Sequence, residues 1–68
     1  MTTTYDPEAD AAYVRLAPKG MKIDSTREVE PGVVLDLDAE GRLVGIEVLN
    51  VRSRVAAGGA ALAVLPAA

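Results

Sequence analysis

The segment from Val33 to Asn50, VVLDLDAEGRLVGIEVLN, limits the possible folds more than any other part of the chain. Apolar and polar residues alternate on both sides of a short polar break, which is typical of two β-strands joined by a tight loop. The break runs from Asp38 to Gly41, with a side-chain acceptor at its start and a glycine where a left-handed residue is needed. We therefore predict an antiparallel hairpin with a three-residue loop and a bulge.

The loop length sets the register of this hairpin and sorts its side chains onto two faces. The predicted pairs are Asp38 with Arg42, Leu37 with Leu43, Asp36 with Val44, Leu35 with Gly45 and Val34 with Ile46. One face then carries Leu35, Leu37, Leu43 and Leu49, and the other carries Val34, Val44, Ile46 and Val48. Gly45 lies in mid-strand, which indicates a bulge, a bend or a close approach by another backbone.

Both predicted faces are largely apolar, which is unusual for a small sheet with one face in water. The C-terminal tail, a second sheet layer or another copy of the chain must therefore cover the second face. An open sheet and a barrel-like closure are both compatible with the pattern.

The remaining chain supplies shorter elements. Strand composition marks residues 2–5 and 11–16, joined by a turn in which Asp6 accepts hydrogen bonds, Pro7 fixes φ and Asp10 either caps the loop or accepts from its backbone. Residues 17–25 read as a loop, and 26–30 as a charged edge strand. Asn50 can cap a helix over residues 51–57 that Gly58-Gly59 ends. The tail after it is either a second helical turn or a frayed end.

These elements predict a mainly β fold of the small α+β kind: an antiparallel β-meander of about five short strands with a short C-terminal helix. Residues 1–57 form a single small β-domain, and residues 58–68 form an Ala/Gly-rich tail.

The chain has 68 residues, and a domain of this size gains little net stability from one core. It contains no Cys and no His, so neither a disulfide nor a zinc site with the usual ligands can stabilise it. We therefore expect a homo-oligomer. The residues predicted for its interface are Val34, Val44, Ile46, Val48, Leu62 and Leu65.

Composition also bears on partners and location. Ten acidic against seven basic residues give a net charge of −3, which argues against a general nucleic-acid surface. Neither a signal-peptide pattern nor an apolar run of membrane-spanning length is present, so we expect a cytoplasmic protein without membrane contact.

The sequence contains few of the residue types that enzymes commonly use for catalysis. Without His or Cys there is neither the usual general base nor a thiol nucleophile, and Ser25 and Ser53 have no evident base. We expect no enzymatic activity and no cofactor. The alternative function is a divalent-metal or small-ligand module, because acidic residues gather at the two hairpin tips. These residues are Asp6, Glu8 and Asp10 at one tip, and Asp36, Asp38 and Glu40 at the other.

For several polar and aromatic residues the sequence allows either a structural or a functional interpretation. Arg42, Arg52 and Arg54 are either solvated partners of carboxylates or a small basic site. Tyr5 and Tyr13, the only aromatic residues, are expected in the core or at an interface. A covered Asp36 would need a partner, for which an arginine from the tail or from another subunit is the candidate.

Two stretches together resemble a family of small prokaryotic proteins catalogued as domain of unknown function 2283. They are YDPEADAAYVRL, residues 5–16, and VLDLDAEGRLVGIEVL, residues 34–49. The resemblance covers about residues 5–55 and implies a compact β-meander with a C-terminal helix. It supplies no catalytic residue; some members look like neighbours of toxin-like proteins, which implies an antitoxin-type role beside a small protein partner. The Gly-Gly break and Ala-rich tail depart from the family pattern.

The sequence thus predicts a non-enzymatic, self-associating protein-interaction module. Asp6, Pro7, Asp10, Asp38, Gly41 and Gly45 are its expected turn and structural residues.

Overall fold

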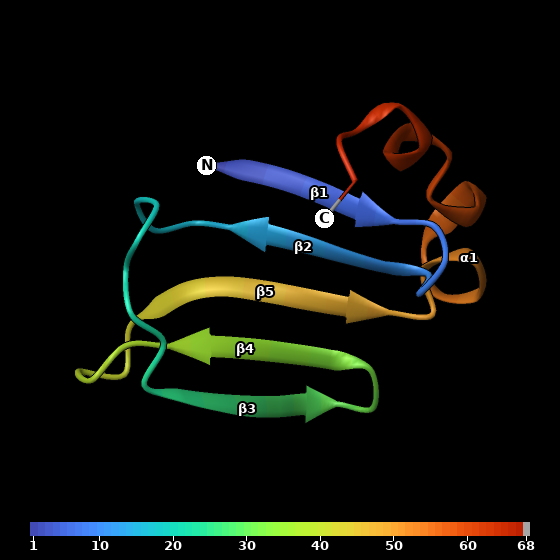
Figure 1. The fold of residues 1–68 in the computed structure, drawn as a ribbon. Helices are drawn as coiled ribbons and strands as arrows, with labels where there is room; N and C mark the ends of the chain where they lie inside the picture. Colours follow the sequence, from blue (N-terminus) through green and yellow to red (C-terminus); the bar gives the residue numbers. More distant parts are fainter. Residues whose placement is uncertain (68) are drawn as a thin grey trace.

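The computed structural model describes residues 1–67 and shows one antiparallel five-stranded sheet followed by two short helical segments (Figure 1). The strands are β1 (Thr2–Asp6), β2 (Ala11–Arg15), β3 (Ser25–Glu30), β4 (Val33–Leu37) and β5 (Leu43–Leu49). The helical segments are α1 (Val51–Arg54) and the 3-10 segment η1 (Ala56–Val64). The predicted fold class, mainly β with five short strands and a short C-terminal helix, is confirmed.

The strand order, β1-β2-β5-β4-β3, differs from that of a simple meander. Strands β3, β4 and β5 follow one another as hairpins, and β5 then lies beside β2, which gives a Greek-key arrangement (Figure 1). The apolar strand β5 thereby takes the centre. The charged strand β3, every residue of which is exposed, takes one edge as predicted. The sheet is open, with β1 and β3 at its edges.

The loop of the β4–β5 hairpin forms as predicted. The Asp38 amide donates to the Arg42 carbonyl at 2.9 Å, the Gly41 amide donates to the Asp38 carbonyl at 3.0 Å, and Gly41 has a φ of 78°. The Asp38 carboxylate also accepts from the amides of Glu40 and Arg42, which fixes the turn.

The predicted register holds only next to this loop and is wrong beyond it. Leu37 pairs with Leu43, but Asp36 pairs with Gly45 rather than Val44, because a bulge shifts the register between Asp36 and Leu37. The extra residue is Val44, whose carbonyl accepts from the amides of Leu16 and Ala17 at the end of β2. Since side chains alternate along a strand, a one-residue shift moves the rest of β5 to the opposite face.

The buried hydrophobic core is small. It comprises Tyr5, Ala12, Val44 and Val51. Tyr5, Ala12 and Val51 form one cluster, against which Val48 and Leu62 pack, so the helical segments cover the sheet at the ends of β1, β2 and β5. Leu62 packs on this cluster and the Pro66 carbonyl accepts from the Tyr5 amide at 3.0 Å, so the tail forms a second helical turn that contacts the sheet rather than a frayed end.

Helix α1 is shorter than predicted and is capped by a different residue. It ends at Arg54 rather than at residue 57, and Asn50, which has a left-handed φ of 56°, makes no side-chain capping bond. Asp10 takes that role from the β1–β2 loop: its carbonyl accepts from the Val51 amide at 3.1 Å, and its carboxylate accepts from the Arg52 amide at 3.2 Å. The cap is therefore supplied by a residue distant in sequence.

The Gly58-Gly59 pair does not end the helical part of the chain. Ala57, Gly58 and Gly59 all have positive φ inside η1, so the segment is two short helical turns joined by a left-handed kink. A Cβ at Gly59 would lie 2.6 Å from Cγ1 of Val51, which shows how closely the kink approaches α1.

Candidate functional site

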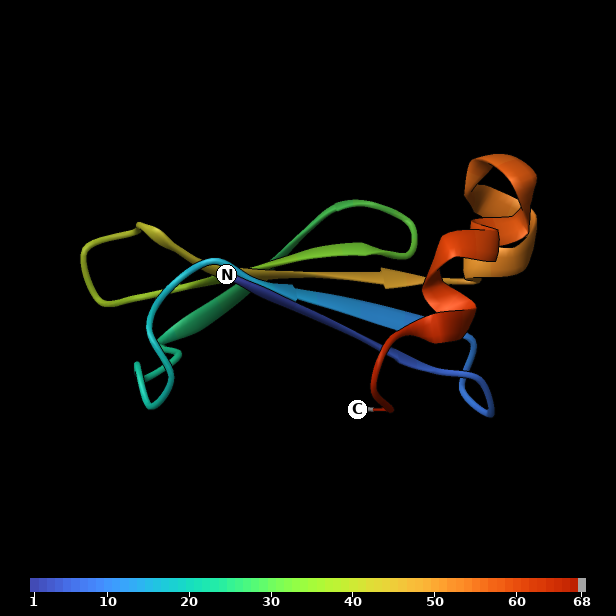
Figure 2. The same cartoon turned by 90° about the horizontal axis from the view of Figure 1, so that it is seen from above.

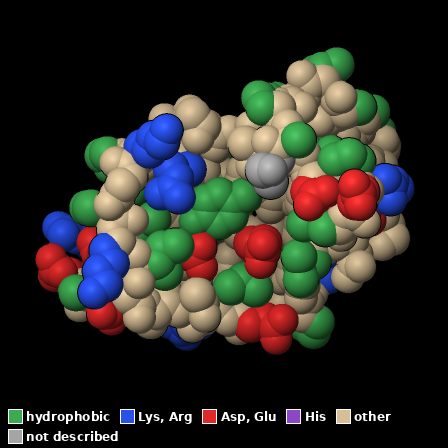
Figure 3. Space-filling model, in the orientation of Figure 1, with side chains coloured by type: hydrophobic (Ala, Val, Ile, Leu, Met, Phe, Trp, Pro, Cys, Tyr) green, Lys and Arg blue, Asp and Glu red, His purple; other side chains and the backbone are tan. Residues whose placement is uncertain are grey.

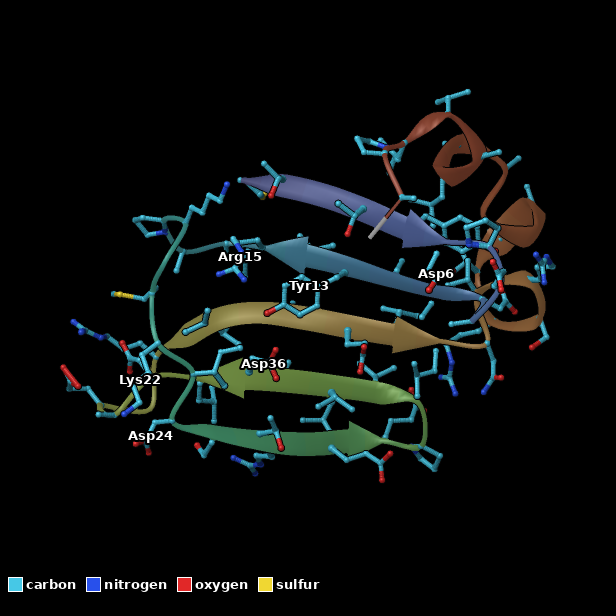
Figure 4. All side chains as sticks on the ribbon, in the orientation of Figure 1. Asp6, Tyr13, Arg15, Lys22, Asp24 and Asp36 are labelled. Carbon is cyan, nitrogen blue, oxygen red and sulfur yellow. The ribbon has the colours of Figure 1, made fainter. Side chains whose placement is uncertain are left out.

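The two faces of the sheet differ in chemistry, and the observed register assigns each side chain to one of them. Directly paired residues share a face. The back face carries Val14, Val33, Leu35, Leu37, Leu43, Ile46 and Val48. The front face, on which Tyr13, Arg15 and Asp36 are labelled in Figure 4, also carries Ala11, Val34, Gly45, Glu47 and Leu49. All the charged residues of the central strands lie on the front face, and most of their large apolar residues lie on the back face.

The helical segments cover only one end of this back face. Figure 2 shows the sheet edge-on as a single layer with the helical segments gathered at one end. Val48 packs against the buried cluster there, whereas Leu43 at the other end is 44% exposed. Between them, Val14, Leu35 and Ile46 are half-buried by their neighbours in the sheet. No helix within residues 1–67 is long and apolar enough to cross a membrane.

The residues predicted for an interface do not form one surface. Ile46 and Val48 lie on the back face, but Val34 pairs with Glu47 and lies on the front. Val44 is 1% exposed and so offers no surface. Leu62 packs against the core cluster, and Leu65 is half-buried in the tail. The prediction of faces was wrong because the bulge at Val44 lies between the loop and these residues.

Gly45 is the point on the front face where an aromatic ring crosses the central strand. The Tyr13 side chain reaches from β2 over β5, and its hydroxyl donates to the Asp36 carboxylate on β4 at 2.7 Å (Figure 4). A Cβ at Gly45 would lie 2.2 Å from the Tyr13 hydroxyl oxygen, so only glycine leaves room for the ring. Of the alternatives predicted at Gly45, the bulge is confirmed beside it, and the close approach is made by a side chain and not by another backbone.

Tyr13 and Asp36 form a hydrogen-bonded pair on the front face. Asp36 is 9% exposed, and its partner is this hydroxyl rather than the arginine we expected. Burial and the bonded carboxylate raise the pKa of Tyr13 to about 12. A hydroxyl with that pKa stays protonated at neutral pH and serves as a fixed hydrogen-bond donor.

Arg15 lies beside this pair on the front face. Its Cζ lies 5.7 Å from the centroid of the Tyr13 ring, within cation–π range. Its Nη1 atom is buried and has no hydrogen-bond partner among residues 1–67. Basic, acidic and hydrophobic side chains are intermixed over this face (Figure 3).

Among the acidic residues at the hairpin tips, Asp6 and Asp38 accept from amides of their own turns, whereas Asp10 bonds Tyr5 and α1 instead of its loop, contrary to the prediction. Asp6 accepts from the Glu8 amide at 3.0 Å, as predicted for the turn at Pro7. Asp10 accepts from the Tyr5 hydroxyl at 2.7 Å. The backbone amide and the guanidinium of Arg42 lower the pKa of Asp38. Within the described part of the chain, no three acidic side chains are grouped so that they could hold a metal ion.

The three arginines of the C-terminal half lie apart and each contacts a carboxylate. Arg42 Nε lies 2.9 Å from Asp38, Arg52 Nη1 lies 3.9 Å from Asp10, and Arg54 Nη1 lies 3.4 Å from Glu30. Arg54 also donates to the Pro31 carbonyl and lies against Gly32, which ties α1 to the β3–β4 turn. These arginines are structural partners and do not form one basic site.

A groove of about 610 Å³ follows the free edge of β1 and was not predicted from the sequence. Met1–Thr4 line one wall, and Arg15, Pro18, Lys19 and Pro66 are among the residues that complete it. The predicted hairpin of residues 2–5 with 11–16 places the loop after β2 beside the start of β1, but nothing in the sequence indicated that Pro66 of the tail also reaches this edge.

Comparison with known proteins identifies one family. The family model described as "Protein of unknown function (DUF2283)" matches residues 2–52, which includes all five strands. Neither a curated protein nor a solved structure matches the chain.

Proposed function

The chain belongs to the DUF2283 family of proteins of unknown function, and from that premise we propose that it is a non-enzymatic, self-associating interaction module. Two copies pair through their back faces, so that two sheets enclose a shared apolar layer.

The main support for this proposal is that few hydrophobic residues are buried in the core while many apolar residues lie on the back face. Four hydrophobic residues are buried, and besides one of these, Ala12, seven apolar residues of the three central strands lie on the back face, most of it without a covering element. Monomeric proteins rarely leave a continuous apolar surface of this kind open to water. A second copy would cover it with the same chemistry.

The dimensions of the sheet suit such a pairing. Two sheets pack about 10 Å apart when side chains of their inner faces interdigitate. A stable interface buries about 800 Å² on each partner, which is about one sixth of the 4603 Å² of accessible surface. The back face has a polar margin, because Thr3 and Arg27 lie at its two edges.

The side chains available for catalysis support a non-enzymatic role. Ser53 donates to the Asn50 carbonyl at 3.2 Å, and Tyr13 donates to Asp36. Both hydroxyls therefore serve the fold. Asp36 is held by Tyr13 beneath the front surface, where it positions the ring.

The experiment compares two adjacent positions of β4. Leu35→Thr removes apolar area from the back face, while Val34→Thr makes a similar change on the front face of the same strand. Solution mass by light scattering across a dilution series should give a dimer for the wild type and for Val34→Thr, and a weakened dimer for Leu35→Thr. A folded wild-type monomer at all concentrations would overturn the proposal.

A further inference from the structure

The two edges of the sheet are protected very differently. β3 carries Arg27, Glu28 and Glu30, and its register shifts between Glu28 and Glu30. Charges and bulges of this kind discourage another strand from pairing with an edge. From Met1 to Thr4, the β1 edge has no charged side chain and pairs with β2 in continuous register.

The outward main-chain groups of β1 are partly free. The Tyr5 amide donates outward to the Pro66 carbonyl at 3.0 Å. Since outward groups recur every second residue in an antiparallel strand, the groups of Thr3 point the same way. Among the described residues, the Thr3 amide has no outward acceptor. The tail therefore makes a single strand-like contact at one end of β1 and leaves the rest of this edge open.

The groove along this edge is basic in an acidic chain. It is lined by Arg15 and Lys19, and within residues 1–67 neither forms an ion pair, unlike Arg42, Arg52 and Arg54. Arg15 also has a buried Nη1 atom without a partner. Figure 3 shows basic side chains together over the adjoining ends of β1 and β2.

From these observations we propose that the β1 edge binds an extended acidic peptide segment of a partner protein as a sixth strand. The outward groups of Thr3 and Tyr5 pair with the peptide main chain, and the Pro66 carbonyl is displaced from Tyr5. Thr2 pairs with Arg15, so both lie on the front face. A Glu or Asp of the peptide opposite Thr2 therefore lies on the Arg15 side, where a charge-assisted hydrogen bond can form.

The positive charge of the groove favours an acidic peptide over a second copy of the chain. A second β1 edge would bring its own Arg15 and Lys19 toward the same groove, and like charges would oppose each other. This site is separate from the back face, so the two proposals can fail independently.

The test uses an acetylated and amidated peptide of alternating glutamate and valine, with a lysine–valine peptide as its matched control. Amide NMR shifts of the labelled protein should change at Thr2–Tyr5 on adding the glutamate peptide, with at least tenfold weaker binding of the lysine peptide. Arg15→Gln should weaken glutamate-peptide binding at least tenfold. Equal binding of both peptides, or shifts at β3 instead of β1, would overturn the proposal.

Thr3→Pro provides a second variant that targets the main chain. The substitution removes an amide that faces away from β2, and edge strands tolerate proline at such positions. It should abolish peptide binding while the β1–β2 pairs remain. The proposal of a peptide at this edge would be contradicted if Thr3→Pro bound the peptide as the wild type does. It would also be contradicted if light scattering showed that Thr3→Pro converts a dimer to a monomer. Leu35→Thr, altered only on the back face, should bind the peptide as the wild type does.

Discussion

The Tyr13 hydroxyl donates to the Asp36 carboxylate at 2.7 Å across the full width of the central strand, and the absence of a side chain at Gly45 makes this possible. The bond joins β2 to β4, two strands that have no main-chain hydrogen bonds to each other. It therefore fixes the front surface of the sheet at the position where the bulge has weakened the ladder.

Gly45→Ala should destabilise the protein by about 1–3 kcal/mol, because the new methyl group would lie 2.4 Å from Cζ of the Tyr13 ring and force it to move. Urea unfolding measures the change. In a Tyr13→Val background the ring is gone, so the same substitution should be neutral or stabilising, as alanine is preferred to glycine within strands. An equal cost in both backgrounds would show that the ring is not the cause.

Tyr13 should ionise late in the folded protein. Its pKa of about 12 lies above the ordinary value of about 10, so its stabilising contribution is complete below pH 10 and is lost as pH rises toward 12. Tyrosinate absorbance during an alkaline titration should show this step, and Tyr13→Phe should remove it. Ionisation of Tyr13 at its ordinary pKa would mean that the bond to Asp36 does not persist in solution.

Asp38 should contribute to stability only while it is ionised. Its pKa is lowered in the folded state, so its contribution is present above the ordinary value of about 3.9 and is lost as pH falls through the folded-state pKa. Asp38→Asn keeps an acceptor for the turn but removes the charge, and should flatten the acid limb of a stability–pH curve. Glu8→Gln makes the same change in net charge at another turn; if it flattened the limb equally, the Asp38 turn would not be responsible.

Asp10→Ala should loosen the helical segments from the sheet, because it removes both the Tyr5 bond and the acceptor for the Arg52 amide. The loss of a helix cap costs about 1 kcal/mol. Hydrogen exchange should become faster in α1, with Asp10→Asn restoring part of the protection. Unchanged exchange in α1 after Asp10→Ala would contradict the capping role.

Much of the fold could be predicted because its signals are local. The loop from Asp38 to Gly41, the turn at Asp6 and Pro7, and the charged edge at residues 26–30 all depend on residues next to one another. Each forms as the sequence predicts.

The candidate surfaces could not be predicted because they depend on pairings distant in sequence. One extra residue at Val44 exchanged the faces beyond it, so Val34 moved to the front and Leu35 joined Ile46 on the back. Insertion of β5 between β2 and β4 gave Asp36 its Tyr13 partner. Gly45 was the one local sign of this arrangement, since a glycine in mid-strand marks a close approach without identifying what approaches.

The central claim is that two copies share the apolar back face, and solution mass tests it most directly. Light scattering across a dilution series should give twice the chain mass for the wild type, with Leu35→Thr raising the dissociation constant at least tenfold, equivalent to about 1.4 kcal/mol, and Val34→Thr leaving it unchanged. A wild-type chain that stays folded with the mass of one copy throughout the series would contradict the claim.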